Sequence, residues 1–159
     1  MRKTLALAAL LGLSASAAAR PADRIEDGFG KADELISRGK FSQARAELDA
    51  LLVDLRDKDA RMVRYHERKG AAWLGEGLVK EARTAFTSAL KAVQRLKVTS
   101  DDGGRAYTGM GLCLRREGND AYALKFFKKA LSFDLDEGTR MFAEDQIREI
   151  EGSPPQPAR

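Results

Sequence analysis

The stretch Gly118-Asn119-Asp120-Ala121-Tyr122-Ala123-Leu124-Lys125-Phe126-Phe127-Lys128-Lys129-Ala130-Leu131 contains the pattern that decides the fold. Its first three residues predict a turn that ends one helix and begins another. In the helix after this turn, one face carries small and large side chains in alternation: Ala123, Phe127, Ala130 and Leu131. A neighbouring helix can approach closely at the alanines, while the larger side chains fill the space beside them.

The same pattern occurs twice more, after Gly77 and after Gly39. Gly77 is followed at the same offsets by Ala82, Phe86, Ala89 and Leu90, and Gly39 by Ala44, Leu48, Leu51 and Leu52. The three glycines are separated by 38 and then by 41 residues. A unit that recurs at such a spacing predicts a stack of similar helix pairs.

These units resemble the tetratricopeptide repeat, a helix-turn-helix motif of about 34 residues. The motif has a small residue seven positions before the turn glycine and a large apolar residue four before it. Here the small residues are Ala32, Gly70 and Gly111, and the large ones are Leu35, Trp73 and Leu114. Tyr107 matches a further large position, whereas His66 and Gly28 depart from it, and Asp134-Leu135-Asp136 stands where Asp-Pro is usual. The alternative is a generic amphipathic helical bundle, which needs no small residues at fixed offsets.

The resemblance implies an all-α fold, an α-solenoid of three such units followed by a C-terminal capping helix. The units span residues 25–58, 61–98 and 104–136, with helices expected at 25–38, 41–56, 61–76, 79–96, 105–117 and 120–133. Thr99–Gly104 predicts a loop. Residues 137–151 place Ala143, Ile147 and Ile150 on one face, as expected of a helix that covers the last apolar surface of an array. Residues 152–159 predict a proline-rich extended tail.

Residues 1–19 have the pattern of a secretory signal peptide. Arg2 and Lys3 precede an apolar run over Leu5–Leu13, and Ala17-Ala18-Ala19 predicts cleavage before Arg20, with Ala15-Ser16-Ala17 as a second site. The run is far shorter than the ~20 residues that span a bilayer, and no cysteine follows it to carry a lipid. We therefore expect an exported protein, periplasmic or secreted, with no stable membrane anchor and with a polar segment, residues 20–24, before the first helix.

The charge balance argues against nucleic acid as a partner. The chain has 28 Lys and Arg against 24 Asp and Glu, and because Arg2 and Lys3 lie within residues 1–19, the remainder has 26 against 24. A protein so close to neutrality has no net field that would hold an anionic polymer or membrane.

The sequence indicates no catalytic, metal or cofactor site, so we expect a protein that is not an enzyme. His66 is the single histidine, and no ligand spacing joins it to Cys113, the single cysteine. Cys113 is expected to be a buried small residue, with a reactive thiol or an intermolecular disulfide as the minority interpretation. Gly109-Met110-Gly111 lacks the Lys-Ser/Thr of a phosphate-binding loop, and the pairs Asp57/Asp59 and Asp101/Asp102 lie in polar segments that would not raise a carboxyl pKa.

In tetratricopeptide proteins the first helices of successive units line a concave groove. By that resemblance, the groove positions are Glu26, Phe29, Asp33 and Ile36 in the first unit, Arg64, Glu67, Arg68 and Ala71 in the second, and Arg105, Thr108, Leu112 and Arg116 in the third. We expect the four arginines to form a basic floor that suits acidic peptides, opposite Glu26 and Asp33. The family's carboxylate clamp is matched at Arg105 only, since Phe29, Asp33 and Gly109 occupy its other positions. A charged face that is merely solvated is the alternative.

The sequence thus predicts an exported interaction module, a scaffold that binds a protein or peptide segment in this groove. Two alternatives remain: an assembly factor or pilot-type chaperone for an envelope complex, and an accessory regulator of a cell-wall enzyme. Reversing Arg68 and Arg105 to glutamate should abolish partner binding and leave the melting temperature nearly unchanged, because surface substitutions usually have little effect on stability.

Overall fold

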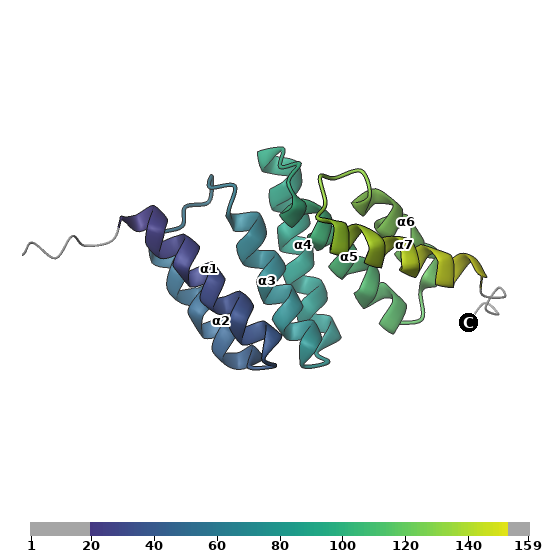
Figure 1. Cartoon of the computed structure of the whole chain (residues 1–159), viewed down its shortest axis with the longest axis horizontal. Helices are drawn as coiled ribbons and strands as arrows, with labels where there is room; N and C mark the ends of the chain where they lie inside the picture. Colours follow the sequence, from purple (N-terminus) through teal and green to yellow (C-terminus); the bar gives the residue numbers. More distant parts are fainter. Residues whose placement is uncertain (1–19, 153–159) are drawn as a thin grey trace, which may run out of the picture.

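The computed structural model describes residues 20–152, which form an all-α solenoid of consecutive helix pairs. The pairs are α1 (Pro21–Ser37) with α2 (Phe41–Ala50), α3 (Met62–Gly75) with α4 (Val79–Leu96), and α5 (Asp101–Arg116) with α6 (Asp120–Ala130); a short 3-10 helix, η1 (Leu51–Val53), extends α2, and α7 (Glu137–Gly152) comes last. Figure 1 shows the pairs stacked in chain order along the long axis of the molecule. The predicted fold is confirmed.

Each turn glycine ends its helix in the same way. Gly39, Gly77 and Gly118 have φ of +70°, +82° and +77°, in the left-handed region that a side chain disfavours. At each turn the glycine N–H and the next N–H donate back to carbonyls of the last helical turn; at Gly118 the acceptors are Arg115 and, for the N–H of Asn119, Leu114. These two hydrogen bonds end the first helix, and the chain then reverses direction into the antiparallel second helix.

The small and large positions of the repeat pack against each other, as the pattern predicts. Phe86 and Phe127 are about 1% and 0% exposed. A Cβ added to Gly70 would lie 2.7 Å from the Phe86 ring, and one added to Gly111 would lie 2.7 Å from the Phe127 ring. In the first unit Ala32 and Leu48 belong to one buried cluster. The aromatic rings therefore fill space that only glycine leaves open.

Several helix bounds differ from the predicted ones. Helix α1 begins at Pro21, four residues early, and α2 ends at Ala50, where η1 takes over. Helix α5 begins at Asp101, so Gly103 and Gly104 lie in its first turn rather than in a loop. They are buried there because the side chains of Phe133 and Leu135 pack directly against their Cα atoms. This tertiary packing outweighs the poor helix propensity of glycine.

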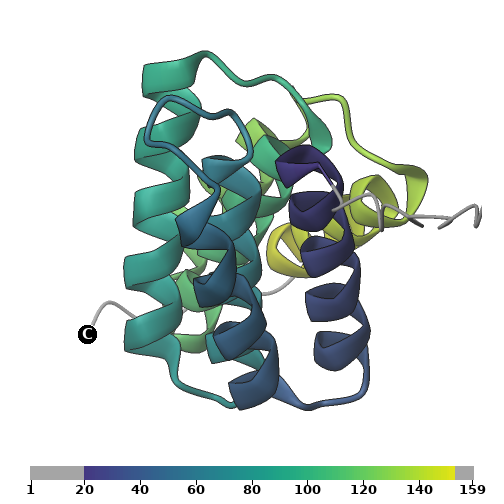
Figure 2. The same ribbon diagram turned by 90° about the vertical axis from the view of Figure 1, so that its left-hand side faces the viewer.

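The solenoid has two dissimilar sides. Figure 2 shows α1 and α7 on one side of the stack and α4 on the other. We call the side that carries α1 and α7 the inner side. Helix α7 packs on α6 through Ala143, which is fully buried together with Ala123 and Phe127. Within residues 20–152, no helix combines the length and apolar character that crossing a membrane requires. The predicted signal peptide and the tail beyond Gly152 lie outside the described residues.

Candidate functional site

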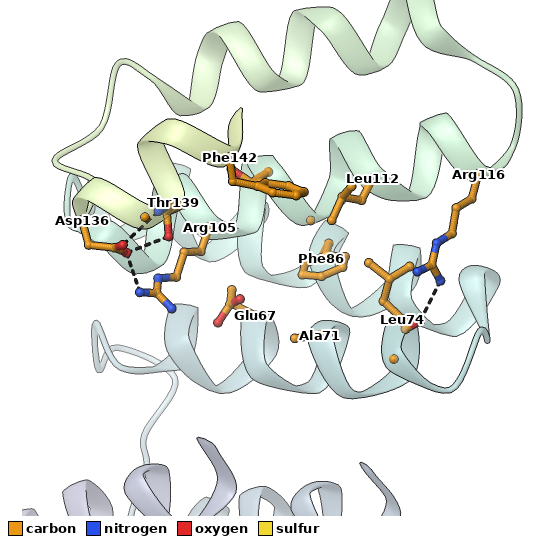
Figure 3. A pocket seen from close by; sticks show the side chains of 14 residues that line it. Glu67, Ala71, Leu74, Phe86, Arg105, Leu112, Arg116, Asp136, Thr139 and Phe142 are labelled. Carbon is orange, nitrogen blue, oxygen red and sulfur yellow. Dashed lines mark hydrogen bonds and ion pairs between the residues drawn. The ribbon is translucent and has the colours of Figure 1, made fainter. Parts of the chain in front are cut away.

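A cavity of about 600 Å³ opens on the inner side between α3, α5 and the start of α7. Its apolar lining comes from all three helices and from α4: Ala71, Leu74, Phe86, Gly109, Leu112 and Phe142. Figure 3 shows Phe142 reaching from α7 over the cavity, on the side opposite Ala71. The polar lining includes Glu67, Arg105, Arg116 and Asp136. A volume of this size matches pockets that bind small molecules or a few residues of a peptide.

Toward the N-terminal end of the molecule, the inner side is closed by ion pairs between α1 and α3. The guanidinium of Arg64 donates to Glu26 at 3.0 Å and to Asp33 at 3.2 Å, and Arg68 pairs with Asp33 as well. Arg64 also lies 4.6 Å above the ring of Phe29. The prediction that Arg64 and Arg68 form a free basic surface is therefore wrong. Glu26 and Asp33, which were expected to lie opposite these arginines, form ion pairs with them.

Glu67 and Arg68 form a buried pair at the edge of the cavity. Their exposed fractions are 5% and 8%, and Arg68 donates to one oxygen of the Glu67 carboxylate. Burial raises the pKa of Glu67, and the charge of Arg68 opposes that shift. Burial alone would lower the pKa of Arg68, but the charges of Glu67 and Asp33 outweigh it and leave that pKa raised. The two side chains thus shift each other's pKa toward the charged form, while burial opposes the charge on both.

Arg105 joins α5 to the start of α7. Its guanidinium pairs with Asp101 on its own helix and with Asp136. Asp136 caps α7, since it accepts hydrogen bonds from the N–H and the hydroxyl of Thr139 at 2.9 and 2.7 Å. These bonds from Thr139, with the contribution of Arg105, hold the pKa of Asp136 far below its usual range. Arg105 and Asp136 together fix the wall of the cavity that α7 supplies.

Replacing Asp136 by alanine should destabilise the protein by about 1–2 kcal/mol, because α7 loses its cap and Arg105 loses a partner. The pKa of Asp136 is lowered by folding, so its contribution is present above the ordinary carboxyl range and lost as the pH falls below about 4. Thermal unfolding from pH 7 to pH 2 should therefore show the difference between wild type and Asp136→Ala shrinking with acid. Glu137→Ala, beside it and without these bonds, is the control; a difference that is constant with pH would contradict the assignment.

Arg116 is the groove arginine that differs from the others. Its Nη1 donates to the backbone carbonyl of Leu74 at 2.7 Å, which anchors the side chain beside the cavity. Within residues 20–152, no carboxylate oxygen pairs with it, whereas Arg64, Arg68 and Arg105 each have at least two such partners. Among the four groove arginines, it is therefore the one whose charge no carboxylate of the described residues neutralises.

The remaining predicted groove residues fall into three groups. Ala71 and Leu112 line the cavity, half-buried. Thr108 also lines it, but is 6% exposed and donates its hydroxyl to the Gly104 carbonyl. Phe29 is a correction: it is 0% exposed and belongs to the core of the first unit, so it does not lie on the groove surface. Ile36 is half-buried and lies outside the cavity lining.

Sequence reasoning missed the contribution of the segment between α6 and α7. The sequence pattern places Asp136 at the end of the third unit and Thr139 and Phe142 in a helix that only covers the end of the array, yet all three residues line the cavity. The Asp-x-x-Thr spacing is a typical N-cap signal and could have located the helix start. Nothing in the sequence indicates that the first turn of this helix lies against the inner side.

Cys113 is buried, as predicted, and burial, with a smaller contribution from Glu117, raises the pKa of its thiol to about 11. A thiol with such a pKa is protonated at neutral pH and a poor nucleophile. Burial also lowers the pKa of His66, which is half-buried on α3. Among the described residues, no cluster of histidine, cysteine and carboxylate side chains has the arrangement of a metal site.

The fold and its inner cavity define a tetratricopeptide-repeat-like α-solenoid. A tetratricopeptide-like protein from Chlorobium tepidum superposes with a TM-score of 0.63 at 18% identity, over 82% of this chain and 98% of that one. The N-terminal domain of stress-induced protein-1 from C. elegans superposes with a TM-score of 0.58 at 12% identity, over 81% and 98%. No family model matches the sequence, and no curated protein matches it. These likenesses show the fold.

Proposed function

We propose that this protein is an exported, non-enzymatic interaction module that binds a segment of a partner protein in the cavity between α3, α5 and α7. The observation that carries this proposal is the cavity itself: about 600 Å³, open on the inner side, with an apolar lining and a few polar groups at its edges. Solenoids of stacked helix pairs use such inner surfaces for binding.

The distribution of ion pairs favours binding at this part of the inner side. Arg64 and Arg68 already share Glu26, Asp33 and Glu67, so an acidic peptide would have to break these pairs to reach them. The cavity farther along the stack instead offers Leu112, which is half-buried, and Phe142, which is 41% exposed, and their apolar surface gains free energy when a ligand covers it. Export is proposed from the signal-peptide pattern of residues 1–19.

Filling the cavity tests this proposal. A photo-crosslinking residue at Leu112, in the protein expressed in its own host, is expected to capture one partner at a defined segment. Ala71→Phe should place a ring in the cavity and reduce that crosslink at least tenfold, because Ala71 lies in the lining and is half-buried. Ala46→Phe is the matched control, since Ala46 is exposed on α2, outside the cavity. Equal crosslinking by all three proteins would refute binding in the cavity.

A further inference from the structure

The two ends of the cavity differ in charge. In the charge network around Glu67 and Arg105, seven carboxylates accompany four arginines: Glu26, Asp33, Asp59, Glu67, Asp101, Asp102 and Asp136 with Arg61, Arg64, Arg68 and Arg105. This end therefore has an excess of carboxylates even where single carboxyls are protonated. At the other end, Arg116 stands without a carboxylate partner in the described part of the chain. A ligand in the cavity experiences a field that favours a cation at one end and an anion at the other.

The carboxylate of Glu67 has one oxygen to offer a ligand. Arg68 donates to Oε2, and within residues 20–152 no hydrogen bond reaches Oε1. Glu67 is 5% exposed, and Figure 3 shows its side chain directed from α3 into the cavity. Because Glu67 is nearly buried, a ligand cation that donates to this oxygen gains more there than it would at the surface.

The guanidinium of Arg116 offers hydrogen-bond donors at the end of the cavity away from Glu67. The bond from Nη1 to the Leu74 carbonyl holds the guanidinium beside the last turn of α3 and leaves its other N–H groups unused by the described residues. Leu74 follows Glu67 by seven residues, which is about 10 Å along a helix with a rise of 1.5 Å per residue. A peptide in the polyproline II conformation covers that distance in about three residues, at about 3.1 Å each, and its residues i and i+3 lie on the same side.

We propose that the cavity selects an extended peptide segment with a basic side chain at Glu67, an acidic side chain about three residues away at Arg116, and apolar side chains between them on Leu112 and Phe142. This inference rests on the proposed function and adds the chemistry of the partner. Only one end of the segment is acidic, in contrast to the acidic peptide that the sequence suggested. Chain direction follows from the charges, so reversing the order of the two charged residues reverses the bound chain.

Short capped peptides titrated into the protein, with binding followed by backbone amide shifts in NMR spectra, test the inference. The probe acetyl-Gly-Lys-Leu-Leu-Glu-Gly-amide should bind at least tenfold more tightly than the same peptide with two lysines or with two glutamates. A peptide whose charges are six residues apart should lose a similar factor, because it overshoots the cavity. Shifts should be centred on Ala71 and Gly109, which line the cavity.

Charge reversal gives a second, independent readout. Arg116→Glu should reverse the preference at that end, so that the peptide with two lysines binds more tightly than the Lys-Leu-Leu-Glu probe. Lys91→Glu, an exposed residue of α4, makes the same change in net charge and should leave the ranking unchanged. No binding of any peptide, equal binding of all charge patterns, or an unchanged ranking in Arg116→Glu would overturn the inference. The proposed function fails separately, on the crosslinking of Ala71→Phe.

Discussion

Replacing Arg68 by glutamate is expected to lower the free energy of unfolding by about 3–5 kcal/mol, the usual cost of breaking a buried ion pair from one side. Arg68 is 8% exposed and bonds Glu67 and Asp33 together. A glutamate there would lie among carboxylates, with Glu67 left uncompensated in a site where burial already raises its pKa. The sequence predicted that reversing Arg68 would leave stability nearly unchanged, whereas the structure predicts a large loss of stability.

Urea unfolding of purified variants measures this cost. Arg116→Glu reverses the same charge on an exposed side chain and loses only its hydrogen bond to the Leu74 carbonyl, so it should cost about 1 kcal/mol. Arg68→Lys keeps the charge but loses the forked geometry, so it should fall between wild type and Arg68→Glu. A double variant with leucine at Glu67 and Arg68 should recover much of the loss, since it removes the buried charges together. If Arg68→Glu is as stable as Arg116→Glu, the buried pair is misassigned.

The fold was predictable because its determinants are local and periodic. Gly39, Gly77 and Gly118 have left-handed backbone, and a glycine that recurs at the same place in each unit already predicts such a turn from the sequence. The contact between Gly70 and Phe86 has the same offset as the contact between Gly111 and Phe127, so one pattern predicts both. Helix α4 begins and ends at the predicted residues for the same reason, since its apolar face is continuous from Ala82 to Val93.

The site was less predictable because its determinants are distant in sequence. A charged helix face has the same pattern whether it is solvated or paired, and Arg64 finds Asp33 only because α1 packs beside α3. Phe142 reaches the cavity through the direction of α7, which depends on the bonds among Asp136, Thr139 and Arg105. The resemblance to the repeat family therefore indicated the arginines of the groove but could not separate Arg116, which lacks a carboxylate partner in the described chain, from the others.

Replacing Phe86 by alanine is expected to cost about 3–5 kcal/mol, a large share of the 5–15 kcal/mol typical of a domain. The ring is 1% exposed and contacts two units of the solenoid at once. An added Cβ would lie 2.7 Å from it at Gly70 on α3 and 2.3 Å from it at Gly109 on α5. Tyr122→Ala, which removes an aromatic ring that is 56% exposed, should cost far less. Comparable losses in the two variants, measured by urea unfolding, would contradict this packing.

A double-mutant cycle with Gly109 identifies the contact itself. In the wild type, Gly109→Ala should destabilise the protein by about 1–3 kcal/mol, because the new methyl group overlaps the Phe86 ring. In Phe86→Ala the ring is gone, and the same substitution should stabilise by up to about 1 kcal/mol through helix propensity. Gly30→Ala, at a helical glycine with open space around it, should stabilise both backgrounds equally. The sign of the Gly109→Ala effect must therefore change with residue 86, and a sign that stays the same would place the ring elsewhere.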